Sequence, residues 1–328
     1  MMNLTPILDA VRRASLLCRE VQKSHIIENA KAFSEPVTIA DYGSQAIINR
    51  ALRAAFPQDS IMAEEDGAQF MALVSDEQKQ VIAQLVSVAL GQPVTVGEIA
   101  TWLDYANYSG HEGRVWVIDP IDGTKGFLAH RHYCVAVGVL EGGQPNAAVM
   151  GCPAYPGFEG GALFSAQDGA AYRMPLMDAS AAPQPVRVSE RVAPLEVRVL
   201  ESVEKSHVGH ERMARVQQLA GYGDSPVERV DSQEKYARIA AGDGELYLRL
   251  PRVNSTRGHS TWDHAAGAAL LYAAGGTVTD IDGTPLDFTT GRELSNNQGM
   301  IVSNGRFHDK ILDAVRIVLD EEARARGE

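Results

Sequence analysis

The run DPIDGT at residues 119–124 places two aspartates, Asp119 and Asp122, three positions apart at the end of an apolar segment. The proline between them fixes its own φ and biases Asp119 toward an extended backbone. Such a turn can direct both carboxylates and the carbonyl of Ile121 at one point, and hard divalent cations prefer oxygen ligands of this kind. The backbone N–H groups of Gly123 and Thr124 follow and can hold a phosphate oxygen. The run therefore predicts a cation site beside an anion site.

Further acidic residues elsewhere in the chain can complete such a site. Glu64 and Glu65 begin an acidic triplet that follows a short apolar step. Asp263 and Asp41 each stand near the expected start of a helix, where an aspartate commonly caps the helix and offsets its dipole. Taken singly, the triplet reads as a solvated loop and each aspartate as a cap, so only the combination with residues 119–124 indicates a metal centre.

The sequence offers no covalent nucleophile for this centre. It contains no serine, histidine or cysteine constellation typical of one, no GxGxxG run and no Walker A run. The three cysteines, Cys18, Cys134 and Cys152, fit neither a zinc site nor a redox pair and are interpreted as buried thiols of a reducing compartment. Dispersed carboxylates without a nucleophile favour direct attack by a metal-activated water, typically between two ions about 3.5–4 Å apart.

The elements that must position these residues fall into two halves. The expected helices span residues 4–31, 41–55, 76–92, 96–104, 209–220, 232–241 and 263–274. The expected strands of the first half span residues 114–118, 133–140, 146–152 and 161–165, with short turns that suit an antiparallel sheet. Strands and helices alternate after the Pro-rich stretch 174–186, so an α/β second half is expected. The predicted domains are 1–186, carrying most metal ligands, and 187–328, carrying Asp263.

Composition limits the class of partner. The chain has 328 residues, is 45% hydrophobic and carries a net charge of −12. That charge disfavours a nucleic-acid polymer or an anionic membrane as partner, although bound cations can still reverse the local field for a small anion. No apolar run approaches the roughly 20 residues needed to span a bilayer, and the N-terminus does not resemble a secretory signal, so a cytoplasmic protein is expected.

Several segments together resemble the lithium-sensitive, Mg²⁺-dependent inositol monophosphatase superfamily. The matching segments are VTIAD at 37–41, AEED at 63–66, WVIDPIDGTKGF at 116–127 and STWDHAAGAALLYAAGG at 260–276. They occur in the family's order and extend over nearly the whole chain. The resemblance implies a layered α-β-α-β-α fold with an N-terminal antiparallel sheet and a C-terminal α/β part, and it implies two or three Mg²⁺ ions.

The family's roles transfer to matching positions. The resemblance implies that the metal ligands are Glu64, Asp119, the carbonyl of Ile121, Asp122 and Asp263, with Glu65 as a second acidic position. It also implies that Asp41 and Thr124 orient and deprotonate the attacking water, and that the amides of Gly123 and Thr124 form the phosphate cradle.

Within the superfamily, three features resemble the 3′(2′),5′-bisphosphate nucleotidases. Lys125-Gly126 follows DPIDGT where simple inositol monophosphatases usually have Thr-Asn, and a helical insertion separates Glu65 from Arg114. DSQEKY at 231–236, followed by ELYLRLP at 245–251, resembles the nucleotide-recognition segment. The substrate-binding residues implied in this way are Asp231, Ser232, Lys235, Tyr247 and Arg249, with Ser206 and His207 as a further contact.

Strand geometry agrees with this assignment. In ELYLRL the leucines share one face, and Tyr247 and Arg249 share the other. An arginine there can hold a phosphate, a tyrosine can line an adenine pocket, and Lys235 adds a second positive group. An ordinary half-exposed strand face is the alternative explanation.

The implied reaction is hydrolysis of the 3′-phosphate of 3′-phosphoadenosine 5′-phosphate, and of 3′-phosphoadenylyl sulfate, in sulfur metabolism. The expected partner is a small phosphorylated nucleotide, and the expected assembly is a monomer or homodimer. An inositol- or sugar-phosphate phosphatase of the same fold is the first alternative, and a non-catalytic nucleotide or metal sensor is the second.

Overall fold

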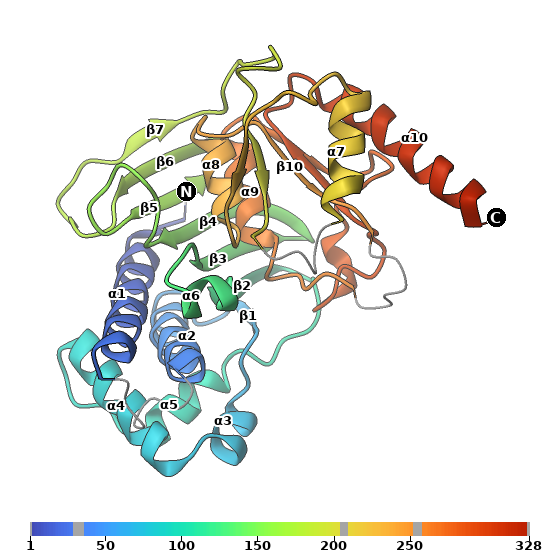
Figure 1. Ribbon diagram of the computed structural model, residues 1–328. Coiled ribbons are helices and arrows are strands. Elements are labelled where there is room, and N and C mark those ends of the chain that lie inside the picture. The colour runs from blue at the N-terminus through green and yellow to red at the C-terminus, as the bar shows by residue number, and fades with distance from the viewer. Residues whose placement is uncertain (1, 29–35, 204–208, 252–257, 327–328) are drawn as a thin grey trace.

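The computed structural model describes residues 2–28, 36–203, 209–251 and 258–326 (Figure 1). Its helices are α1 (Thr5–Glu28), α2 (Pro36–Ala55), α3 (Gly67–Leu73), α4 (Asp76–Leu90), α5 (Val96–Leu103), α6 (Thr124–Leu128), α7 (His210–Leu219), α8 (Glu234–Ala240), α9 (Ala265–Ala273), the 3₁₀ turn η3 (Phe288–Thr290) and α10 (His308–Arg326).

The strands of the described residues form a seven-stranded and a five-stranded sheet. The first sheet contains, in spatial order, β1 (Ser60–Ala63), β2 (Arg114–Asp122), β3 (Cys134–Glu141), β4 (Gln144–Cys152), β5 (Ala162–Gln167), β6 (Ala170–Pro175) and β7 (Gln184–Val186). The second sheet contains, in spatial order, β11 (Thr277–Thr279), β12 (Met300–Ser303), β10 (Leu246–Arg249), β8 (Val199–Glu201) and β9 (Val227–Arg229).

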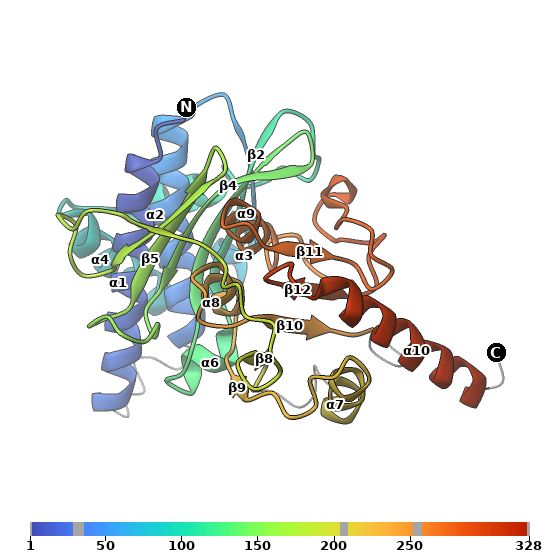
Figure 2. The same ribbon diagram turned by 90° about the horizontal axis from the view of Figure 1, so that it is seen from above.

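The first sheet is covered on both faces. Its strands β2 and β3 are buried almost along their whole length, as expected where neither face of a sheet meets water. On one face α1 and α2 bury Val11, Leu17 and Ile47 in a core shared with the sheet. On the other face α9 packs closely on β3, because Gly138 leaves room for the backbone of Ala266 that a Cβ would meet at 2.8 Å. The sheet is thus a layer between two helical layers (Figure 2).

The second sheet continues the layering. One face, with Tyr247 and Val302, shares a core with α8 and α9. The opposite face, with Leu246 and Leu248, packs against α7 and α10. The order of layers is therefore α1 and α2, first sheet, α8 and α9, second sheet, α7 and α10, which confirms the expected α-β-α-β-α fold.

Some elements differ from the sequence prediction. Within the described residues helix α2 already includes Pro36, five residues before the expected start at Asp41. The stretch interpreted as a linker contains the whole of β7, which pairs antiparallel with β6 at the edge of the first sheet. Helix α3 and the C-terminal helix α10 were not predicted from the sequence.

Two other expectations concern the interior and the surface. All three cysteines are buried free thiols, as predicted. No helix in the described part of the chain has both the length and the apolar character required to cross a membrane.

Candidate active site

Parallel pairing of β1 with β2 brings the first two acidic positions together. Ala63 lies opposite Ile118, and the N–H of the next residue, Glu64, donates to the Ile118 carbonyl at 3.3 Å. Because the two strands run parallel and in register, Glu64, the first residue after β1, lies beside Asp119 of β2. The two motifs, about 55 residues apart in the sequence, thus meet at one sheet edge.

An irregularity in β2 aligns the two aspartates of residues 119–124. Asp119 pairs with Ala136 and Asp122 with Cys134, so three steps along β2 match two steps along β3. In a regular strand, residues three apart point to opposite faces, but one extra residue restores them to the same face. The hydroxyl of Ser44 on α2 holds this segment by donating to the Pro120 carbonyl at 3.0 Å.

The carboxylates of this edge repel one another. Burial raises the pKa of Asp119 well above its usual range, and the charges of Glu64, Asp122 and Asp263 raise it further. The residue Glu64 as a whole is exposed, but protein atoms surround its carboxylate and raise its pKa to about 7. Repulsion from Glu65 and Asp263 contributes to this rise. The pKa of Asp122 is also raised by burial, partly offset by Lys235. Like charges held this close favour a bound cation.

The donor groups fit a hard divalent cation. Asp119 Oδ1 and Asp41 Oδ1 are buried and accept no hydrogen bond, and a buried oxygen without a partner is costly unless a cation or water completes it. Within the described ranges, no three acidic, histidine or cysteine side chains already converge as a finished ligand set. The carboxylates are close enough to repel one another, but they are not arranged around a single point. Carboxylate oxygens are typical ligands of Mg²⁺.

Asp41 and Thr124 differ in their exposure. Asp41 lies inside α2, not at its start, and is 6% exposed, with a pKa raised by burial and then by Glu65 and Glu64. Thr124 is exposed at the pocket and opens the short helix α6 after Gly123, whose φ of 91° is the left-handed conformation that glycine tolerates. The Thr124 hydroxyl lies 3.5 Å from the Ile121 carbonyl. Because Asp41 lies within α2 and not at its start, the helix-cap explanation for Asp41 is wrong.

Asp263 faces these groups from the second half of the chain. It lies two residues before α9, and His264 occupies the cap position, so Asp263 stands one residue before that position. Its Oδ2 lies 4.0 Å from an Arg249 nitrogen. Asp263 thus lies between the acidic residues at the end of β1 and β2 and the Arg249 guanidinium of β10.

The opposite side of the pocket is built on β10. Tyr247 and Arg249 project from one face of this strand, and Leu246 and Leu248 pack on the other, as predicted. The Arg249 guanidinium lies 3.3 Å from Nε2 of His264, whose Nδ1 lies 3.0 Å from the Tyr236 hydroxyl. Burial lowers the pKa of His264 well below its usual range, with a further contribution from Arg249. A neutral imidazole can accept from the guanidinium and hold it at the pocket.

Residues 231–235 line the floor beside β10. The Asp231 carboxylate accepts from Arg131 Nε at 3.0 Å and from the Val203 N–H at 3.2 Å. Ser232 has a φ of 69°, an uncommon conformation for a serine. Lys235 is buried, donates to the Val230 carbonyl at 3.0 Å and lies 4.9 Å from the Tyr247 ring centre.

Burial lowers the pKa of Lys235 to about 8. The Val230 carbonyl and the Tyr247 ring are nevertheless partners for its ammonium within the protein. Ser206 and His207 lie outside the described residues.

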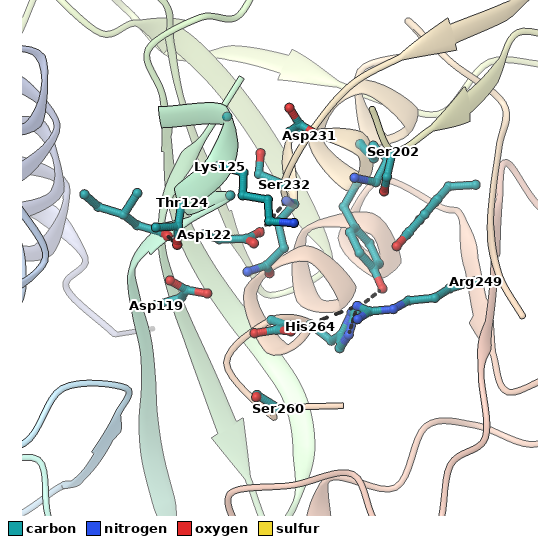
Figure 3. A pocket seen from close by; sticks show the side chains of 18 of the residues that line it. Asp119, Asp122, Thr124, Lys125, Ser202, Asp231, Ser232, Arg249, Ser260 and His264 are labelled. Carbon is teal, nitrogen blue, oxygen red and sulfur yellow. Dashed lines mark hydrogen bonds and ion pairs between the residues drawn. The ribbon is translucent and has the colours of Figure 1, made fainter. Parts of the chain in front are cut away.

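These groups enclose one pocket of about 390 Å³, within the range of small-molecule sites. Figure 3 shows Asp119, Asp122 and Thr124 on one side and Arg249 and His264 on the other. The lining residues predicted from the sequence are Glu64, Asp119, Ile121, Asp122, Gly123, Thr124, Asp231, Ser232, Lys235, Tyr247, Arg249 and Asp263. Asp41 and Glu65 are not among the lining residues; Glu65 pairs through its backbone with the Gln45 side chain.

Sequence reasoning missed several residues of the pocket. Gln233 and Tyr236 lie within the DSQEKY segment, so their position next to the expected site residues was a usable signal. His264 adjoins Asp263 in the sequence but was not among the expected site residues. Ser202 and Ser260 have no distinguishing motif, and only the folded chain brings them to the pocket.

Known proteins resemble this chain in sequence and in fold. A sequence model described as the inositol monophosphatase family matches residues 4–319. A Candida albicans protein named 3′(2′),5′-bisphosphate nucleotidase 2 is 36% identical over an alignment 340 positions long, which covers 93% of this chain and 94% of that protein. A Schizosaccharomyces pombe protein named 3′(2′),5′-bisphosphate nucleotidase is 33% identical, over 95% of this chain and 94% of its own.

Among solved structures, an inositol monophosphatase from Anabaena (Nostoc) superposes with a TM-score of 0.59 at 24% identity, over 96% of this chain and 97% of that chain. A Thermotoga maritima IMPase superposes with a TM-score of 0.60 at 21% identity, over 96% of each chain. Both support the layered fold.

Proposed function

This chain belongs to the inositol monophosphatase family, and from that premise we propose that it hydrolyses the 3′-phosphate of 3′-phosphoadenosine 5′-phosphate to AMP and phosphate. The 3′-phosphate of 3′-phosphoadenylyl sulfate is proposed as a second substrate. Several relatives more than 30% identical over nearly the whole chain are named 3′(2′),5′-bisphosphate nucleotidases, which supports this choice.

The observation that carries the proposal is the composition of the single pocket described above. It joins the acidic edge at Asp119 and Asp122 to the segment 231–235 and to Tyr247 and Arg249. A bisphosphate nucleotide needs an acidic, cation-binding end for the scissile phosphate and a positive, aromatic end for the second phosphate and the base. Gly126 permits this junction, because a Cβ there would lie 2.0 Å from the His132 carbonyl and 3.1 Å from the Asp231 side chain.

The proposed Mg²⁺ ligands are the carboxylates of Glu64, Asp119, Asp122 and Asp263 with the carbonyl of Ile121, and Glu65 stands behind them as a further acidic group. When bound, Mg²⁺ supplies charge neutralisation of the phosphate and a lowered pKa for a water molecule. Two or three ions are proposed from the family resemblance.

The protein groups proposed to act on the water are Asp41 and Thr124. Thr124 presents its hydroxyl at the pocket surface and has the Ile121 carbonyl as an acceptor for its proton, which leaves its lone pairs free to orient a water. Asp41 has a buried oxygen without a partner and is proposed to take the proton from that water. The amides of Gly123 and Thr124 are proposed to hold a non-bridging phosphate oxygen.

On the other side, Arg249 is proposed to bind the 5′-phosphate and Tyr247 to line the adenosine site, with Asp231, Ser232 and Lys235 as further contacts. Ser206 and His207 remain a proposal from sequence. The pKa of the buried Lys235 ammonium is lowered to about 8, so it supplies positive charge below that pH.

We also propose that the chain consists of two domains, residues 1–186 and 187–328. The first sheet ends at Val186, and every described strand of the second sheet follows it. The pocket draws on both parts, since Asp119 belongs to the first and Asp263 to the second.

An inositol-phosphate phosphatase is the second candidate, because the acidic edge does not distinguish the two substrates and the superposed structures include inositol monophosphatases. A panel decides between them: Mg²⁺-dependent phosphate release from 3′-phosphoadenosine 5′-phosphate and from inositol 1-phosphate, each with and without lithium. The nucleotide is expected to be preferred and lithium to inhibit. Higher kcat/KM on inositol 1-phosphate would transfer the assignment, and no release from either would refute it.

A further inference from the structure

We propose that Gln233 is a positioning residue that holds Asp122 and the segment of Asp263 in register, so that carboxylates from both halves of the chain can bind the same cations. The inference rests on the proposed function, because it concerns the same cation site.

Three hydrogen bonds of Gln233 reach both parts of the site. Its backbone N–H donates to Asp122 Oδ2. Its side-chain Nε2 donates to the Trp262 carbonyl at 2.9 Å, one peptide before Asp263. Its Oε1 accepts from the Gly267 N–H at 3.0 Å.

The Gly267 contact fixes the helix that follows Asp263. Gly267 lies in the first turn of α9, where N–H groups have no partner inside the helix and need one from outside. Helix α8 approaches α9 closely at this point, since a Cβ on Gly267 would lie 2.5 Å from the Tyr236 ring. The carboxamide of Gln233 therefore ties Asp263 from both sides, through the carbonyl before it and the helix after it.

The chemistry of the side chain is specific to glutamine. Gln233 is 2% exposed, so water cannot replace its bonds. It must donate to a carbonyl and accept from an N–H at once, which a carboxamide does and a carboxylate or an alkyl group does not. A carboxylate would also add negative charge beside Asp122, whose pKa burial already raises.

The left-handed Ser232 supports the same role. With a φ of 69°, this residue turns the chain so that the next N–H points at Asp122. Uncommon backbone conformations persist where the surrounding structure over-determines them. The turn and the carboxamide together connect β2 of the first sheet to α9.

The test is Mg²⁺ binding to the protein without substrate, measured by isothermal titration calorimetry and by fluorescence of the tryptophans, among which Trp262 adjoins the site. Gln233→Met keeps the side-chain length and removes both carboxamide bonds. Gln217→Met is the matched control, because Gln217 is also buried on a helix of the second half, lies outside the pocket, and its Nε2 makes no hydrogen bond.

Gln233→Met is expected to weaken Mg²⁺ binding about tenfold or more, the usual effect of removing an outer partner of a metal ligand. Its kcat/KM is expected to fall at low Mg²⁺ and to recover toward the wild-type value at saturating Mg²⁺, which a general loss of structure would not do. Gln217→Met is expected to bind Mg²⁺ like the wild type.

Mg²⁺ affinity of Gln233→Met within about twofold of the wild type, in a folded protein, would overturn the inference. If Gln233→Met does not fold, Gln233→Asn decides, since its carboxamide is one methylene too short to reach both partners and the same loss of affinity is expected. Failure of the wild type itself to bind Mg²⁺ would refute the proposed function and this inference together, whereas a wild type that binds and a variant that binds equally well refutes only the inference.

Discussion

The two sides of the pocket are built on opposite principles. On the acidic side, Asp119 keeps a buried oxygen without a hydrogen-bond partner, and neighbouring carboxylates raise one another's pKa. On the basic side, Arg249 lies against His264, and Lys235 donates to the Val230 carbonyl. The first side is electrostatically incomplete, whereas the second is already held in place by the protein.

The difference indicates what each side is for. A group of repelling carboxylates gains stability only when cations arrive, so its geometry is set together with the metal. A fixed guanidinium beside a neutral imidazole needs no rearrangement to receive a phosphate, and such preorganisation favours binding because less freedom is lost. Four predictions test this contrast, taken from the largest expected effect to the smallest.

Asp119→Asn is expected to lower kcat/KM by about 10³-fold or more, because loss of a metal ligand removes several kcal/mol of charge stabilisation. The unfolding temperature without Mg²⁺ is expected to stay level or rise, since a repelling buried carboxylate is gone. Steady-state kinetics and calorimetry check both, with exposed Asp224→Asn as the control. An active Asp119→Asn enzyme would contradict the assignment of the acidic side.

Arg249→Met is expected to raise KM for 3′-phosphoadenosine 5′-phosphate by roughly 10- to 100-fold, the range for losing a hydrogen bond to a charged group. Inositol 1-phosphate, which lacks a second phosphate, is expected to be hydrolysed with little change. Exposed Arg229→Met on β9 is the matched control. An equal loss on both substrates would remove Arg249 from substrate selection.

Stabilisation by Mg²⁺ is expected to grow with pH. The pKa of Glu64 is raised from 4.5 to about 7 in the metal-free fold, so the folded state binds more protons than the unfolded chain between these values. Without metal, the contribution of Glu64 to the free energy of unfolding is therefore fully present below pH 4.5 and is lost as the pH rises through 7. Cations bind the ionised form, so the Mg²⁺-induced rise in unfolding temperature is expected to be larger at pH 8 than at pH 5.5.

Thermal scans at both pH values, with and without Mg²⁺, measure this rise. Glu64→Gln removes the titrating group and is expected to reduce the difference between the two pH values. An equal Mg²⁺ effect at both pH values in the wild type would contradict the coupling.

Asp66→Ala is expected to leave kcat/KM within about twofold of the wild type while lowering the free energy of unfolding by about 1 kcal/mol. Asp66 caps α3, accepting from the Gln69 N–H at 2.9 Å, and does not line the pocket. Chemical denaturation and kinetics separate the two effects. A large loss of activity would place the third carboxylate of the triplet in the cation site as well.

The sequence by itself determined the chemistry of the acidic side. The spacing of Asp119 and Asp122 around a proline is a local property, and the pattern of ELYLRL already separates Tyr247 and Arg249 from the leucines. The layered fold also followed from residues, because the motifs and their order resemble one family. The edge strand β7 did not follow in this way, because it depends on pairing with β6, which no local pattern reveals.

Only the tertiary structure decided how the two sides meet. The β2 irregularity that aligns the aspartates is defined by pairing with β3, and Glu64 reaches Asp119 through parallel pairing of β1 and β2. The contacts of His264 with Arg249 and of Gln233 with Asp122 join segments from different layers. Hydrogen bonds between residues distant in sequence have no periodicity to read, so the roles of these buried polar groups become visible only once the layers are packed.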